Sequence, residues 1–183
     1  MKTLVAGALV LAALAGSAQG AMVWSGLDLE FSKPDYADWT QPENQDRITD
    51  NVWITRQNSQ GLFNIVLEDY MSDWTASPLD TEWAFSGIGS NVNPVFGAGE
   101  GTTMLGDLFF EGWVPSLDYW VGDNIVDRPG VLHLITDDIY IDILFTSWTG
   151  QGAGGGFTYL RGVPAPSSLA LLGLGGLALR RRR

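Results

Sequence analysis

The chain has 183 residues, a formal net charge of −11, a single histidine and no cysteine. The lack of cysteine excludes a disulfide framework, a thiolate metal site and a cysteine nucleophile, and one histidine excludes a multi-histidine zinc site. Residues 21–162 hold all 21 acidic residues but only five basic ones, which gives this body a net charge of −16. Nucleic acid is excluded as a ligand, because phosphate recognition needs clustered lysine and arginine.

Residues 1–20 have the three parts of a secretory signal peptide. Lys2 supplies a positive start, and an apolar run follows from Leu4 to Ala15. Small residues at Ala18 and Gly20 suit cleavage after Gly20, with cleavage after Ala18 as the alternative. The run has no polar face, so we interpret it as a signal helix rather than the first helix of a folded domain. The partners expected for it are the Sec export machinery and signal peptidase.

Residues 21–162 predict one β-rich domain that is long enough to bury a sizeable core. All 21 aromatic residues lie between Trp24 and Tyr159, and aromatic and β-branched residues favour strands. Glycine and proline punctuate the body and leave little room for long helices. We therefore expect an all-β fold, an antiparallel β-sandwich or jelly roll, flanked by the signal helix and a short C-terminal transmembrane helix.

Alternation of apolar and polar residues places the strands. In chain order we expect strands at residues 27–31, 52–55, 62–66, 82–85, 105–114, 131–135, 138–146 and 157–160. The intervening polar, glycine-rich or proline-containing segments are expected to be loops at residues 32–50, 87–103, 115–130 and 149–156.

The strongest prediction is a hairpin over residues 131–148. The pair Thr136-Asp137 separates two apolar runs and is expected to form the turn. Beyond it, one face of the second strand should hold the isoleucines at 139, 141 and 143 together with Phe145. We interpret the glycine-rich residues 152–156 as a flexible hairpin connection, because they lack the ending of a phosphate loop and lead into a strand.

The body offers few candidates for catalysis. His133 is the only residue that could serve as a catalytic imidazole near neutral pH. It lies mid-strand, and no Gly-x-Ser-x-Gly motif accompanies it, so we interpret it as a hydrogen-bonded sheet histidine. Glu82 and Glu111 are the best pair for glycoside hydrolysis, since each neighbours a tryptophan, but the Glu-x-Asp-x-x-Glu spacing of laminarinase-like enzymes is missing. We expect no enzyme, and a secreted glycoside hydrolase is the less favoured alternative.

Calcium is the one metal that the composition suits, because loops rich in Asp and Asn supply oxygen ligands. The weak candidates are Asp123, Asn124 and Asp127, with Asp46 and the pair Asp50-Asn51 as a second group. Neither group matches the Asp-x-Asp-x-Asp-Gly loop, and a structural role in turns is the favoured interpretation. We expect no cofactor, with calcium kept as the alternative.

Three tryptophans invite a sugar-binding interpretation, since pyranose faces stack on exposed aromatic rings. Trp39, Trp74 and Trp120 lie in polar loops rather than in strands, so they are the aromatic residues most expected to be exposed. The competing interpretation is that they fold back as lids on the core. A carbohydrate-binding module would require a groove lined by such residues.

Residues 163–183 contain a short motif, an apolar run and a basic cluster. Val163, Pro164, Ala165 and Pro166 form the motif, and the thirteen residues 167–179 are Leu, Ala, Gly and two Ser. As a helix they span roughly 20 Å, against a hydrocarbon core of about 30 Å, so we expect a transient anchor in the inner membrane. The basic cluster should stay cytoplasmic and consists of Arg180, Arg181, Arg182 and Arg183.

This layout resembles the PEP-CTERM sorting signal of Gram-negative bacteria, whose motif is usually Val-Pro-Glu-Pro. Val163, Pro164 and Pro166 match that motif, and Ala165 replaces its glutamate. The resemblance covers about the last twenty residues of the sequence. It implies recognition by an exosortase-type transpeptidase, which would cleave near the motif and pass the protein toward the cell surface. A plain C-terminal membrane tail is the competing interpretation.

The body also resembles a block shared by many uncharacterised secreted bacterial proteins, some with this same tail. The resemblance rests on residues 53–56, 61–64, 133–148 and 154–159. It implies a single β domain up to about Arg161 and brings no known activity.

We therefore expect an exported, non-enzymatic protein with a structural or adhesive role at the cell surface, in the outer envelope or in extracellular polymer. The carbohydrate-binding module is the first alternative, with extracellular polysaccharide as its partner. The high negative charge disfavours bare anionic polymers unless divalent cations bridge them.

Overall fold

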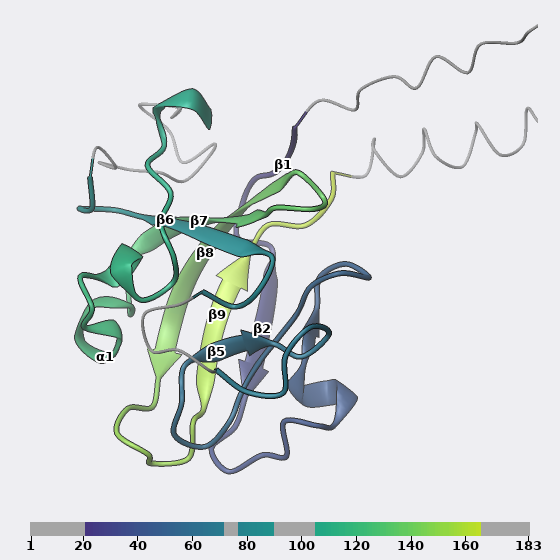
Figure 1. Cartoon of the computed structure of the whole chain (residues 1–183), viewed down its shortest axis with the longest axis vertical. Helices are drawn as coiled ribbons and strands as arrows, with labels where there is room; N and C mark the ends of the chain where they lie inside the picture. The colour runs from purple at the N-terminus through teal and green to yellow at the C-terminus, as the bar shows by residue number, and fades with distance from the viewer. Residues whose placement is uncertain (1–20, 72–76, 90–104, 166–183) are drawn as a thin grey trace, which may run out of the picture.

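The computed structural model describes residues 21–71, 77–89 and 105–165 (Figure 1). The predicted signal peptide, Trp74, Pro166 and the four C-terminal arginines lie outside these ranges. The fold is mostly β, with two antiparallel sheets and few helices, as the sequence predicts. Within the described ranges, no helix combines the length and the apolar character that crossing a membrane requires. The jelly-roll part of the expectation stays a prediction.

The larger sheet has the order β2-β9-β8-β7-β6, and β1 pairs with β8 in parallel. All its other pairs are antiparallel. On the side of β8 that faces away from β7, β1 lies beside the start of the strand and β9 beside the rest. The strands are β1 (Met22–Trp24), β2 (Leu29–Lys33), β6 (Thr81–Phe85), β7 (Pro129–Leu134), β8 (Ile139–Trp148) and β9 (Phe157–Arg161).

The smaller sheet has the order β3-β4-β5 and is antiparallel throughout. Its strands are β3 (Asp46–Arg47), β4 (Trp53–Arg56) and β5 (Leu62–Asn64). The helical pieces are all short: η1 (Pro42–Asn44), η2 (Leu105–Asp107), η3 (Pro115–Leu117) and α1 (Val121–Asn124). Buried side chains of both sheets belong to one core, which includes Ile54 and Leu62 from the smaller sheet and Leu132 and Ile141 from the larger.

The hairpin β7–β8 confirms the strongest sequence prediction. The three isoleucines of β8 and Phe145 are buried on one face, because successive side chains of a strand alternate between faces. The connection is longer than the expected two residues. Leu134 pairs with Ile139, so the loop takes in residues 135–138, and Asp138 adopts a left-handed φ of 51°.

The predicted strand over residues 105–114 is wrong. Residues 105–107 form η2, and the only pairing in this stretch is an isolated bridge between Glu111 and Trp83. Gly106 and Gly112 interrupt the run, and glycine weakens a strand because it has no side chain to pack. The apolar residues of this segment contribute to the core instead of to a strand, since Trp113 is fully buried there.

A buried polar cluster joins the two sheets. Arg161 of β9 donates to both carboxylate oxygens of Asp46 in β3, from Nε at 2.7 Å and from Nη2 at 2.8 Å. The hydroxyl of Tyr159 donates to the same carboxylate at 2.6 Å. All three side chains are buried, and burying charged groups is tolerated only with such complete pairing.

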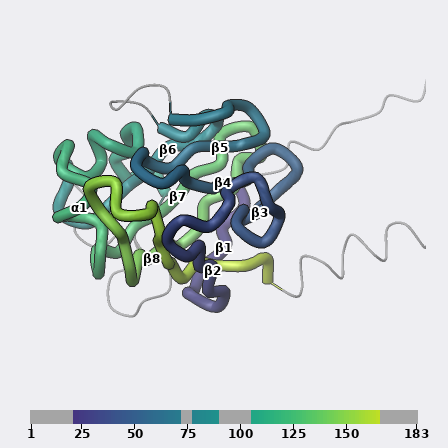
Figure 2. Tube along the Cα trace, turned by 90° about the horizontal axis from the view of Figure 1, so that it is seen from below, coloured from purple at the N-terminus to yellow at the C-terminus, as the bar shows by residue number. Residues whose placement is uncertain are grey.

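The two described ends of the body lie together. Gly162 packs so closely on the backbone of Trp24 that a Cβ at position 162 would overlap the Trp24 carbonyl oxygen. Figures 1 and 2 show both ends leaving the body on one side, while α1 lies on the opposite side. An attachment at either end would therefore hold the same side of the domain.

Candidate functional site

A cleft of about 700 Å³ lies beside α1, on the side away from the chain ends. Together with Met71, three parts of the chain that are distant in sequence form its walls. They are the β4–β5 turn with Arg56 and Gly61, the segment from Trp113 through α1, and the β8–β9 loop that begins at Trp148. A pocket of this size accommodates a ligand of one or a few sugar residues.

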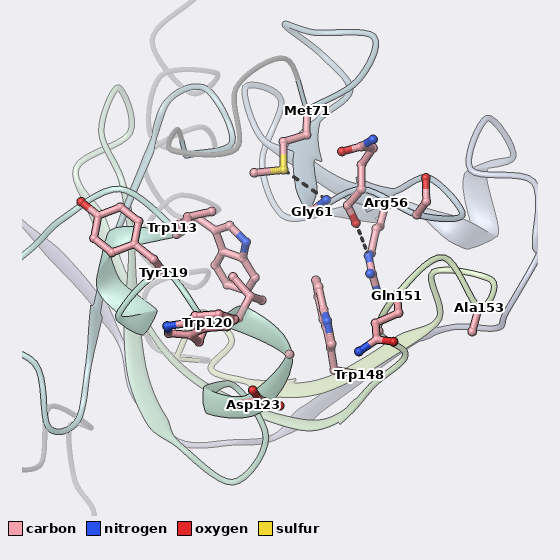
Figure 3. Close-up of a pocket in the computed structure, with 16 residues that line it drawn as sticks. Arg56, Gly61, Met71, Trp113, Tyr119, Trp120, Asp123, Trp148, Gln151 and Ala153 are labelled. Atoms are coloured by element: carbon pink, nitrogen blue, oxygen red, sulfur yellow. Dashed lines mark hydrogen bonds between the residues drawn. The ribbon is translucent and has the colours of Figure 1, made fainter.

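Four aromatic side chains line the cleft. Trp120 and Tyr119 are 69% and 56% exposed, whereas Trp113 is fully buried behind them. Trp148 packs against Trp113 with ring centroids 5.8 Å apart. Figure 3 shows Trp120 and Trp148 on facing sides of the cleft, with Trp113 at the back. An apolar ligand face can therefore lie between two tryptophan walls.

The backbone before α1 is bent sharply to present these rings. η3 ends at Leu117, and the two residues that follow it, Asp118 and Tyr119, are both left-handed, with φ of 54° and 63°. Left-handed conformations cost non-glycine residues about 1 kcal/mol or more, and they cluster at ligand sites. The turn leaves Trp120 at the start of α1 with most of its surface in solvent.

Arg56 holds Trp148 in place. Its guanidinium lies 3.7 Å from the centre of the Trp148 ring. Nε donates to the Gln60 carbonyl, and Nη1 donates to the carbonyls of Thr149 and Gly156 at 2.8 and 3.2 Å. Burial lowers the pKa of the Arg56 guanidinium to about 10, although the nearby Asp35 carboxylate acts in the opposite direction and raises it. The group is therefore still a cation at neutral pH, and it fixes both the β4–β5 turn and the β8–β9 loop.

The β8–β9 loop is packed rather than flexible at its second half, which corrects the sequence-based interpretation. Residues 154–156 are buried. Gly155 has a φ of 67°, and a Cβ there would overlap the Gln57 carbonyl oxygen. The Gly156 amide donates to Asp35 at 2.7 Å. Only glycine fits so close to the Gln57 carbonyl, so the second half of the loop is held in place, whereas its first half, with Gly150, Gln151 and Ala153, lines the cleft.

The back of the cleft contains an unpaired donor. The indole Nε1 of Trp113 is buried and has no hydrogen-bond partner. A Cβ added at Gly61 would lie 3.5 Å from that nitrogen and would overlap the Met71 sulfur. The Gly61 amide already donates to that sulfur at 3.1 Å. The indole N–H of Trp113 and the end of Met71 thus both lie beside the Cα of Gly61, on the side where another residue would carry its side chain.

The sequence-predicted aromatic residues are only partly brought together. Trp120 lines the cleft as a ligand-stacking residue would. Trp39 does not line it, because this residue is half-buried in the segment before η1, where its carbonyl accepts from Gln45. Trp74 lies outside the described residues. Trp113, Trp148 and Arg56 were missed as site residues, because they belong to or border strand-like runs that predict burial in a core.

The calcium candidates are separated into different roles. Asp123 lines the cleft, the Asn124 amide donates to the Leu117 carbonyl at 3.0 Å, and Asp127 is an exposed left-handed turn residue. Asp46 is not available to a metal, because it is buried in its ion pair with Arg161. In residues 21–71, 77–89 and 105–165, no three acidic or histidine side chains are grouped as a metal site requires.

His133 lies on the larger sheet, away from the cleft lining. Its Nδ1 is 2.7 Å from Oε1 of Glu82, and its ring stacks on Tyr140 with centroids 4.0 Å apart. Asp138 is 3.6 Å from Nε2. Burial raises the pKa of Tyr140, and the nearby carboxylates of Asp138 and Glu82 add to the effect. His133 is therefore a hydrogen-bonded residue of the sheet, as the sequence predicted.

The carboxylates considered for glycoside hydrolysis also lie outside the cleft lining. Glu82 is paired with His133, and Glu111 bridges to the backbone of Trp83. Asp123 is the one carboxylate among the described residues that line the cleft.

No protein-family model, curated protein or solved structure matches the chain. The chemistry of the cleft therefore decides which ligand it suits.

Proposed function

We propose that this protein is an exported, non-enzymatic carbohydrate-binding domain that adheres to glycans through the cleft. One observation carries the proposal: the exposed Trp120 and the half-buried Trp148 face each other across a pocket of about 700 Å³. Pyranose rings have apolar C–H faces and polar edges. Tryptophan and tyrosine offer large apolar rings with a polar end, which suits such ligands.

Polar side chains at the rim complete this chemistry. Gln60 and Gln151 border the cleft, and each amide can both donate and accept hydrogen bonds. Ser59 adds a hydroxyl group with the same two capacities. Sugar hydroxyls need both kinds of partner, so the rim can orient a ring that the tryptophans hold by its faces.

Binding is favoured over hydrolysis by the placement of the acids. A glycoside hydrolase uses two carboxyl groups on either side of the scissile bond, about 5–9.5 Å apart. Asp123 stands without a second carboxylate among the described lining residues. A role in adhesion needs only the stacking faces and the polar rim.

Export and surface display follow the expectation from residues 1–20 and 163–183. We propose that the Sec machinery exports the chain, that the C-terminal segment spans the inner membrane transiently as a helix, and that an exosortase-type transpeptidase then processes it. The shape of the body supports display, because the two described ends leave on one side and the cleft lies on the other. A body held at its ends would present the cleft outward.

A glycan array probed with the exported protein tests the binding proposal. Trp120→Ala should weaken binding by about tenfold, which corresponds to ~1.4 kcal/mol. Tyr36→Ala is the matched control, because Tyr36 is also 69% exposed but does not line the cleft. Binding that survives Trp120→Ala unchanged, or the absence of any glycan ligand, would overturn the proposal.

Cell fractionation with intact-mass measurement tests the sorting proposal. The expected mature protein starts near Ala21 and lacks the four C-terminal arginines. A mature form that retains Arg183 in the inner membrane would contradict sorting by an exosortase.

A further inference from the structure

We infer that the cleft selects an N-acetylated hexosamine residue, whose acetamido carbonyl accepts a hydrogen bond from Nε1 of Trp113. This inference rests on the proposed function and names the sugar class within it. The unpaired indole donor at the back of the cleft carries it, since nothing in the stacking walls distinguishes one pyranose from another.

The Trp113 donor is unusual because buried polar groups are nearly always paired. Its ring is fully buried, and its nitrogen has no partner. In Figure 3 the indole nitrogen is turned toward Gly61 and the middle of the cleft. A buried N–H of this kind indicates a missing acceptor, and a ligand entering the cleft can supply it.

The surroundings of this donor favour a carbonyl over a hydroxyl. A hydroxyl would bring its own hydrogen, which needs an acceptor. The Met71 sulfur beside this donor is a weak acceptor and already accepts from the Gly61 amide. A carbonyl oxygen is an acceptor only. The acetamido methyl group would then lie among apolar lining side chains, which include Val114 and Met71.

Because position 61 is glycine, the end of Met71 rather than a side chain of residue 61 occupies the space beside the donor. A Cβ there would stand 3.5 Å from Trp113 Nε1 and would overlap the end of Met71. Methionine is unbranched and adapts its conformation easily, so Met71 can move aside when a ligand enters. Gly61 and Met71 thus give access to a donor that is covered in the unliganded protein.

The charge of the body narrows the class further to uncharged glycans. Asp123 lies at the rim, and the whole of residues 21–162 carries a net charge of −16. A uronate or sulfated polymer would be repelled by this field. The cation of Arg56 does not offset the repulsion at the surface, because it is buried and stacked on Trp148.

Calorimetric titration of the exported protein with two matched trisaccharides tests the inference. Triacetylchitotriose, called chitotriose below, and cellotriose have the same linkage and differ only in the acetamido group that replaces a hydroxyl in each ring. We expect chitotriose to bind at least tenfold more tightly. Equal binding, or tighter binding of cellotriose, would overturn the acetamido inference and leave the proposed carbohydrate function standing. If neither trisaccharide binds and the glycan array shows no ligand, the acetamido inference and the proposed carbohydrate function are both overturned.

Two variants locate the donor. Trp113→Phe keeps an aromatic ring but removes the N–H, so it should abolish the preference for chitotriose. Trp39→Phe is the control, because Trp39 does not line the cleft. If Trp113→Phe does not fold, Gly61→Ala provides the second test, since its methyl group would fill the space beside the donor. A preference that persists in either folded variant would overturn the role of Trp113.

Discussion

Asp46 and Arg161 are 115 residues apart in the chain and form a bidentate ion pair in the interior, at 2.7 and 2.8 Å. One lies in the smaller sheet and the other in the last strand of the larger sheet. The pair therefore links the two sheets directly, and its removal should lower the stability of the whole domain.

Asp46→Asn should lower the free energy of unfolding by about 3–5 kcal/mol, because it leaves the Arg161 guanidinium buried without a counter-charge. Urea unfolding at neutral pH measures the difference. Asp50→Asn is the control, since Asp50 is exposed, and it should change stability by less than about 0.5 kcal/mol. Similar losses in the two variants would show that the buried pair has no special role.

Tyr159 should make the domain sensitive to alkali. Burial, together with the neighbouring Asp46 charge, raises the pKa of its phenol well above the ordinary tyrosine value of 10.0. Above pH ~10 the unfolded chain releases this proton while the folded chain keeps it, so stability that is present at lower pH is lost as pH rises. Tyr159→Phe removes this contribution. Its stability should fall less steeply than that of the wild type between about pH 9.5 and 11.

Urea unfolding of both proteins across that range makes the comparison, and other titrating groups cancel because the two proteins share them. At neutral pH Tyr159→Phe should be less stable by roughly 1–3 kcal/mol, since a hydrogen bond to a carboxylate is lost. Parallel curves for the two proteins above pH 10 would contradict the assignment.

Gly155→Ala should destabilise the domain and disturb the cleft wall. The new methyl group would overlap the Gln57 carbonyl oxygen, and φ at this position is 67°. We expect a loss of about 2–4 kcal/mol, which is typical of strained backbone substitutions combined with overpacking. Gly150→Ala, in the same loop, has open space around its Cβ and should be nearly neutral. Thermal unfolding of the pair decides the point, and equal melting temperatures would contradict the close approach.

Arg56→Lys should be costly although it keeps the charge. Lysine cannot reproduce the planar guanidinium, which bonds from Nε to the Gln60 carbonyl and from Nη1 to the carbonyls of Thr149 and Gly156 while it stacks on Trp148. We expect a loss of about 2 kcal/mol or more, because buried carbonyls lose their donors. Tryptophan fluorescence should also shift as Trp148 loses its support.

Arg47→Lys is the matched control for this substitution. Arg47 also lies over a tryptophan, with its guanidinium 4.1 Å from the centre of the Trp53 ring, but it is exposed. The loss there should stay below about 1 kcal/mol, as exposed cation–π contacts contribute little. Comparable losses at the two arginines would show that burial does not decide the effect.

Sequence reasoning predicted the strands well where one face of a strand meets the core. The buried face of β8 was predicted residue by residue, because apolar and polar side chains alternate there with a period of two. The final strand β9 shows the same alternation, whereas the hairpin of β4 and β5 was predicted from two short strand-like runs on either side of a polar loop. Local patterns carry this information, so a single sequence contains it.

The features that failed depend on contacts between distant segments. The run 105–114 is apolar, but it packs Trp113 into the core through an irregular backbone that no local pattern encodes. From the sequence alone Asp46 is a candidate calcium ligand, because no local pattern shows that Arg161 lies beside it in the fold. Of the cleft residues, Trp120 was predicted because it lies in a polar loop. Arg56 and Trp148 were missed because their pairing spans the two sheets.

The position of β9 has a consequence for the order in which the domain can fold. Among the described residues β9 is the last strand, yet it lies between β2 and β8, and β2 has no other strand there as its neighbour. A chain that crosses a membrane from its N-terminus cannot complete this sheet, or pair Asp46, until residues 157–161 have emerged. Closing such long loops is slow compared with local pairing. If the chain is exported and sorted as we propose, this topology would keep the domain incomplete until residues 157–161 have crossed the membrane, so that processing near residues 163–166 would act on a domain that has just folded.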